Sequence, residues 1–99
     1  DACHGAFIKE YPAAAIRMIG GKIKNVHISD SGYEEFLHTR LGTGIVKPGP
    51  VAEALNDIGY DGVTVLEIIS DALQPGTDPD KDFITSHKIL ADSGWQPLN

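Results

Sequence analysis

Two different spacings of apolar side chains divide this sequence into strands and helices. Residues 23–28 alternate between apolar and polar side chains and include β-branched ones, which predicts a strand that ends near His27. Residues 63–69 are almost continuously apolar, as in strands of parallel sheets that are covered on both faces. Residues 1–5 form a polar cluster typical of the end of a strand whose apolar body lies upstream. We therefore expect two strands and the end of a third.

Helical patterns lie between and after these strands. Residues 12–19 begin with proline, are rich in alanine and stop at two glycines. Residues 50–58 carry apolar side chains at helical spacing before a glycine. Asp78 and Pro79 supply a cap and a first position for a third helix, which should end at Gly94. Strands separated by helices predict an α/β fold with parallel βαβ units.

A polar segment, residues 31–44, is too long for a simple hairpin turn and is therefore a candidate functional loop. It carries His38 and Arg40, which either are solvated or contact hydroxyl or phosphate oxygens of a substrate. Asp30, just before this loop, is expected to cap it rather than to bind a ligand.

Composition and charge narrow the class of protein. The 99 residues are 41% hydrophobic and 22% charged, a typical globular balance. Eight Lys and Arg against fourteen Asp and Glu give a net charge of -6, which disfavours nucleic acid as a partner. No apolar run approaches the roughly 20 residues that cross a bilayer, so no membrane partner is expected. The single cysteine, Cys3, permits no internal disulfide and favours the cytoplasm.

Four side chains that bind metals stand at or near the expected strand ends: Asp1, His4, His27 and Glu67. Ligands bind at the carboxyl ends of parallel strands, and carboxylates with imidazoles suit Mn, Zn, Co or Mg ions. Glu67 is the most informative, because a carboxylate inside an apolar strand needs a cation or a donor. The alternatives are an edge glutamate that faces water and a His27 satisfied by the backbone. A nucleophilic pair of Cys3 and His4 is a further alternative.

Four motifs occur together in one order: residues 1–4 (DACH), 26–30 (VHISD), 38–44 (HTRLGTG) and 59–68 (GYDGVTVLEI). In this order they resemble the C-terminal part of the xylose isomerase-like family of sugar phosphate isomerases and epimerases. The resemblance runs from residue 1 to about residue 70, and the last helix fits the closing helix of that family. It implies the C-terminal portion, about three βα units, of a (β/α)8 TIM barrel. Residues 1–99 would then be part of one barrel domain whose N-terminal units are missing.

The resemblance also implies a site. In similar enzymes two Glu, one Asp and one His hold a divalent ion, which maps here onto Asp1, His27 and Glu67. The other Glu would come from a strand before residue 1. His4 resembles a histidine that contacts substrate, and His38 matches a position that helps to hold substrate or a further metal. Glu67 resembles the carboxylate that both binds metal and moves a proton.

The implied activity is a metal-dependent sugar or sugar phosphate isomerase or epimerase, which removes a proton next to a carbonyl through an enediolate. Its partner would be a small sugar, and a homo-oligomer is expected. One alternative is an endonuclease IV-like repair enzyme for abasic sites with three zinc ions, but those enzymes use an Asp where this chain has Phe36. Another is a binding domain without catalysis. The 99 residues alone are expected to self-associate and to be inactive.

Overall fold

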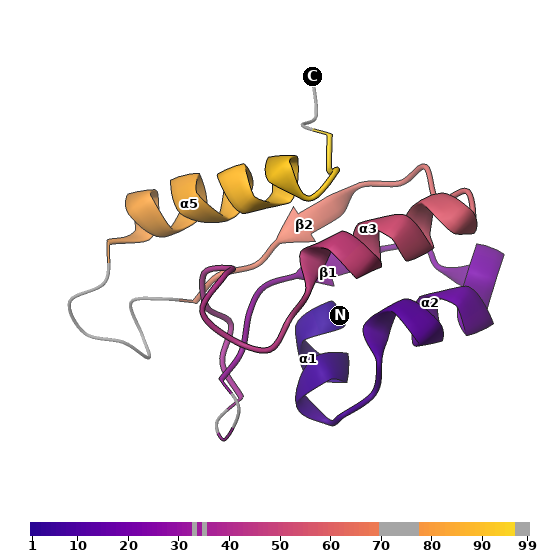
Figure 1. Cartoon of the computed structure of the whole chain (residues 1–99), viewed down its shortest axis with the longest axis horizontal. Coiled ribbons are helices and arrows are strands. Elements are labelled where there is room, and N and C mark those ends of the chain that lie inside the picture. Colours follow the sequence, from indigo (N-terminus) through magenta and orange to yellow (C-terminus); the bar gives the residue numbers. More distant parts are fainter. Residues whose placement is uncertain (33, 35, 70–77, 97–99) are drawn as a thin grey trace.

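The computed structural model describes residues 1–32, 34, 36–69 and 78–96, which form a small α/β structure (Figure 1). Its elements follow one another in this order: α1 (Ala2–Phe7), α2 (Pro12–Ile19), a 3-10 turn (Gly20–Lys22), β1 (Val26–Ile28), α3 (Pro48–Asp57), β2 (Thr64–Leu66) and α5 (Pro79–Asp92). In Figure 1, α2 and α3 lie side by side. α5 runs along β2 and lies on the opposite side of α3 from α2.

The two strands pair in parallel, as the sequence predicts, and α3 is the crossover between them. Val26 lies opposite Thr64 and Ile28 lies opposite Leu66. Both strands are shorter than the predicted 23–28 and 63–69, because only three residues of each are paired in the ladder. One more parallel hydrogen bond follows, in which the Glu67 N–H donates to the Ile28 carbonyl at 3.0 Å.

Helices cover one face of this sheet. Val26 and Ile28 are buried in the same core as the inward side chains of α2 and α3, and Leu66 packs against that core. Val65, which points to the other face, is 43% exposed. The expectation that residues 63–69 are covered on both faces is therefore wrong, since the described helices cover one face only.

The chain begins with a helix. Asp1 caps α1, because its side chain accepts a hydrogen bond from the backbone N–H of His4 at 2.9 Å. Ala2 and Cys3 on this helix are buried, and α1 packs against β1. The prediction of a strand end at residues 1–5 is thus wrong, since a good capping residue followed by small side chains favours a helical turn.

The helices α2 and α5 begin where the sequence predicts, whereas α3 begins earlier. The Asp78 carboxylate accepts hydrogen bonds from the N–H groups of Asp80 and Lys81, which confirms it as the cap of α5. α3 starts at Pro48 rather than residue 50, because proline suits the first helical position. No helix in the described part of the chain is long and apolar enough to cross a membrane.

Candidate functional site

Glu67 directly follows β2, and its side chain lies on the open face of the sheet beside His27 of β1. The Nδ1 atom of His27 is 3.2 Å from Oε2 of Glu67, and both side chains are 39% exposed. Nδ2 of Asn25 lies 3.3 Å from Nε2 of His27. Because an amide nitrogen only donates, this contact makes Nε2 the acceptor and places the His27 proton on Nδ1, toward Glu67.

A buried carboxylate, Asp30, shapes the loop that carries His38. Asp30 is fully buried, and its two oxygens accept five backbone hydrogen bonds. The donors are the N–H groups of Ser31, Gly42, Thr43, Gly44 and Val46 at 2.8–3.1 Å. Such a set of donors compensates a buried charge. The expectation that Asp30 caps this loop is confirmed.

His38 is held in this loop by its backbone and by its ring. The backbone of Thr39 pairs with Asp30, and the Ile69 N–H donates to the His38 carbonyl at 2.8 Å. The ring Nδ1 lies 2.9 Å from the hydroxyl of Ser29, which is only 1% exposed. With Nδ1 occupied in this way, Nε2 is the ring nitrogen available to a ligand.

Asp1, His38 and Glu67 come together into one cluster. Each offers one ligand atom, and these atoms all lie within 4.8 Å of one another. Ligands on opposite sides of a cation with bonds of 2.0–2.2 Å are about 4.2 Å apart, so small side-chain rotations allow all three to reach one ion. Two carboxylates so close repel each other without a cation, and the set of two carboxylates and one imidazole therefore fits a divalent metal.

The sequence placed His27 rather than His38 with Asp1 and Glu67. In the structure His27 reaches this cluster through its contact with Glu67, and His38 supplies the imidazole. Ligation by His27 stays a prediction, and it would require the contact with Asn25 or the contact with Glu67 to break.

The two other residues predicted to bind substrate, His4 and Arg40, have different surroundings in the structure. His4 is exposed on α1, and its ring packs edge-on against Phe36, with centroids 5.2 Å apart. Phe36 in turn packs against His38, at 4.9 Å. Arg40 is half-buried, and the structure gives its guanidinium no ion pair with a described residue. Its donors are therefore not committed to any carboxylate in the described part of the chain.

Sequence reasoning missed the contributions of Ser29 and Phe36 to the site. Ser29 was part of a cluster of turn formers after β1, and its position at a strand end was the available signal. In the sequence, Phe36 stands out only as a departure from the nuclease pattern. Its contacts with His4 and His38 arise from an irregular loop, in which spacing along the sequence does not determine which side chains meet.

Cys3 is not arranged as a nucleophile. Its side chain is fully buried and its thiol donates to the carbonyls of Leu37 at 3.0 Å and Asp30 at 3.3 Å. Burial raises the pKa of the Cys3 thiol, and the nearby charges of Asp30 and Glu67 act in the same direction. The thiol therefore stays protonated at neutral pH, which removes the basis for a catalytic pair with His4.

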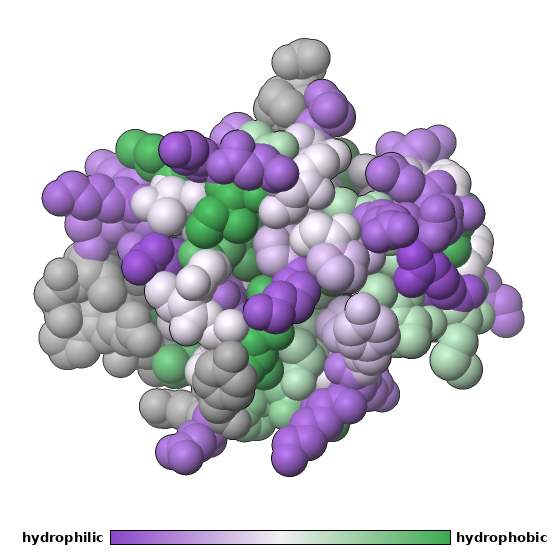
Figure 2. Space-filling model, in the orientation of Figure 1, coloured by the Kyte–Doolittle hydropathy of each residue, from purple (hydrophilic) through white to green (hydrophobic). Residues whose placement is uncertain are grey.

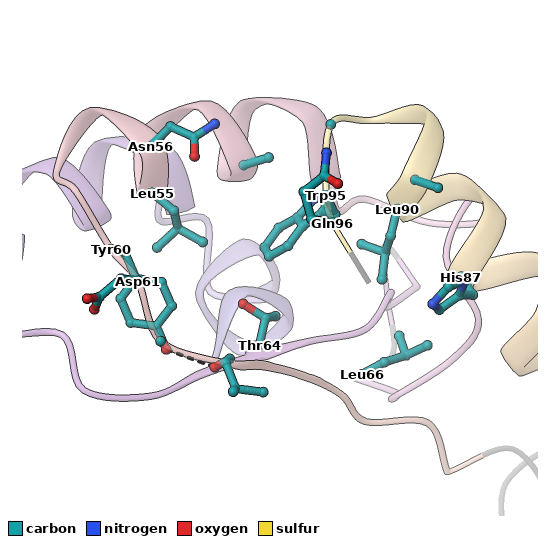
Figure 3. A pocket seen from close by; sticks show the side chains of 15 residues that line it. Leu55, Asn56, Tyr60, Asp61, Thr64, Leu66, His87, Leu90, Trp95 and Gln96 are labelled. Carbon is teal, nitrogen blue, oxygen red and sulfur yellow. Dashed lines mark hydrogen bonds between the residues drawn. The ribbon is translucent and has the colours of Figure 1, made fainter. Parts of the chain in front are cut away.

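A groove of about 570 Å³ lies away from this site, between α3 and α5 (Figure 3). Leu55, Tyr60, Leu66 and Trp95 are among its lining side chains, and the Tyr60 hydroxyl donates to the Val63 carbonyl. Leu66 points to the face that the helices cover, whereas Glu67 points to the open face. The groove and the Asp1, His38 and Glu67 cluster are therefore on opposite sides of the sheet.

Comparison with known proteins assigns this chain to a family. The family model of the xylose isomerase-like TIM barrel matches residues 1–92. A search of curated proteins and a search of solved structures gave no match. The family match spans both strands, the loop that carries His38 and all of α5. The chain belongs to the xylose isomerase-like TIM barrel family.

Proposed function

We propose that this chain carries part of the active site of a metal-dependent isomerase or epimerase that acts on a sugar or sugar phosphate. The observation that carries the proposal is the convergence of Asp1, His38 and Glu67 on one point in a member of this family. The cluster lies on the open face of the sheet, beyond the carboxyl end of β2. Active sites of TIM barrels lie at this end of the strands.

Asp1, His38 and Glu67 would hold the divalent ion, which is Mn, Mg, Co or Zn by its donor set. Capping of α1 uses one oxygen of Asp1, and its carboxylate keeps further acceptor capacity for ligation. An ion held there would supply positive charge to the oxygen atoms that become negative when a proton leaves the neighbouring carbon.

Glu67 is the base in this proposal. Its carboxylate would take the proton from the carbon next to a carbonyl and return it, and the N–H of His27 holds Oε2 in one orientation. Arg40 and His4 would contact substrate. The planar donor fork of Arg40 suits phosphate or paired hydroxyl groups, and no described carboxylate competes for it.

We further propose that the chain forms about three βα units at the C-terminal side of a barrel. Val63, Val65 and Ile69 are 42–54% exposed and alternate along the chain with the side chains that face the helices. In a closed barrel this face is the filled interior. Epimerisation needs a base on each face of the substrate carbon, and in this proposal the second base would be a glutamate on a strand before residue 1.

The test is exchange of hydrogen for deuterium at the carbon next to the carbonyl of ketoses in D₂O, followed by NMR with added Mn, Co, Mg or Zn. One base can perform this exchange, so the assay needs Glu67 and the metal ion but no second base. We expect metal-dependent exchange that falls about 100-fold or more in Glu67→Gln. The exposed Glu53 of α3 supplies the matched control, Glu53→Gln, which should keep the parent rate.

Two results would overturn the proposal. One is metal binding in calorimetry without exchange on any ketose or ketose phosphate tried. The other is metal-dependent cleavage of DNA at abasic sites, which would favour the nuclease alternative in spite of the net charge of -6.

A further inference from the structure

We propose that Phe36 is a positioning residue of this site, whose ring restricts the rotation of the imidazoles of His38 and His4. The inference rests on the proposed metal site and adds a residue that acts through two others. It concerns how the chain orients these two imidazoles before a metal ion or substrate binds.

The ring geometry carries the argument. The Phe36 and His38 centroids are 4.9 Å apart with planes at 74°, and the Phe36 and His4 centroids are 5.2 Å apart with planes at 68°. Both are edge-to-face arrangements, the favoured contact between aromatic rings. One phenyl ring therefore contacts two imidazoles that come from different segments, α1 and the loop after β1.

Burial argues against a simple core role for this ring. Phe36 is 36% exposed and does not belong to the buried hydrophobic core. Among the described residues its other ring neighbour is Phe7, at 5.4 Å, and Phe7 forms no ring pair with either imidazole there. A phenylalanine this exposed contributes less to folding through burial than a core residue does, and its position beside two histidines points to those histidines.

The two imidazoles depend on Phe36 to different degrees. Two described contacts restrain the His38 ring: the hydrogen bond between its Nδ1 and the Ser29 hydroxyl, and the edge-to-face contact with the Phe36 ring. For His4, the Phe36 ring is the one ring or hydrogen-bond partner that the described residues give its side chain. Loss of Phe36 should therefore leave the His4 ring without this restraint and the His38 ring with the Ser29 hydrogen bond as its remaining described one.

Titration of the chain with Co²⁺, followed by calorimetry and by the visible absorption of the bound ion, tests this role. We expect Phe36→Leu to weaken Co²⁺ binding about tenfold and to change the absorption spectrum, as losses of partners behind metal ligands do. Phe36→Tyr keeps the ring and should stay within twofold of the parent. Phe7→Leu is the matched control and should also stay within twofold.

A double-mutant cycle separates a positioning role of Phe36 from a general loss of order in the loop. Ser29→Ala should also weaken Co²⁺ binding, and the double variant Ser29→Ala, Phe36→Leu should deviate from additivity because both restraints act on one ring. Additive effects would mean that the two side chains do not act on a common imidazole and would overturn the inference.

The remaining outcomes are equally decisive. Equal effects of Phe36→Leu and Phe7→Leu, or loss of the circular dichroism spectrum in Phe36→Leu, would assign the ring a structural role and overturn the inference. Binding by the parent that Phe36→Leu leaves unchanged would overturn the inference and leave the proposed function in place. Absence of Co²⁺ binding by the parent would overturn both.

Discussion

At the scale of single residues, Asp30 holds more of the loop together than any other described side chain. Its Oδ1 accepts two backbone N–H groups and its Oδ2 accepts three. In Asp30→Asn an NH₂ group replaces one oxygen, so at least two buried donors lose their acceptor. We expect a loss of about 3 kcal/mol in the free energy of unfolding, measured with urea. Asp61→Asn, at an exposed position, should change it little, and equal effects would contradict this account.

The Cys3 thiol gives a prediction with a defined pH dependence. Burial raises its pKa in the folded chain, so the folded state keeps a proton that the unfolded state releases above about pH 8.5. Stability from this group is fully present below that pH and is lost as the pH rises toward the folded pKa. We expect Cys3 to resist alkylation by iodoacetamide at pH 8 until urea unfolds the chain. Rapid alkylation of the folded chain would show that the thiol is accessible.

At the scale of elements, the turn of residues 42–44 depends on a glycine that lacks room for a side chain. A Cβ on Gly44 would overlap the Ser31 carbonyl and come within 2.6 Å of Oδ1 of Asp30. We expect Gly44→Ala to lower the free energy of unfolding by about 3 kcal/mol and to weaken metal binding through displacement of His38. Gly21→Ala, in the 3-10 turn (Gly20–Lys22) with open space around it, should keep the stability or raise it by up to about 1 kcal/mol. Thermal unfolding of both variants checks the contrast.

Elements whose signals are local could be predicted from the sequence. Asp78 and Pro79 mark the start of α5 because a cap and a first-turn proline act within one turn of chain. The parallel pairing of β1 and β2 also follows, because a helix of this length between two strands forms a crossover. The same local logic existed for Asp1 and α1, but the polar side chains of residues 1–5 favoured the interpretation as a strand end.

Features that depend on partners distant in sequence could not be predicted. The apolar run of residues 63–69 carries no information about whether a second layer covers it, and one face proved open. For the site, the sequence singled out Asp1, His38 and Glu67, but it did not indicate which imidazole lies nearer the two carboxylates. That depends on Ser29 and Phe36, whose contacts with His38 form in an irregular loop.

At the scale of the whole molecule, apolar and acidic side chains share the open face of the sheet. Figure 2 shows green hydrophobic surface among purple hydrophilic side chains on one view of the molecule. Val63, Val65 and Ile69 lie at alternate positions with Glu67 between them and are 42–54% exposed. Apolar side chains in a row beside unpaired strand edges favour association with another sheet. In a barrel the missing cover would be further strands.

This arrangement leads to a prediction for the 99-residue chain on its own. We expect it to self-associate through the open face in sedimentation equilibrium, and we expect Val65→Lys to weaken the association at least tenfold, because a charge then enters the buried surface. Met18→Lys is the control: Met18 on α2 is 87% exposed, but it lies away from the sheet. The same species should show no ketose epimerisation with Mn²⁺, since Glu67 reaches only one side of the reacting carbon. A folded monomer at every concentration would contradict the role of the open face, and epimerase turnover by such a monomer would contradict the need for a second base.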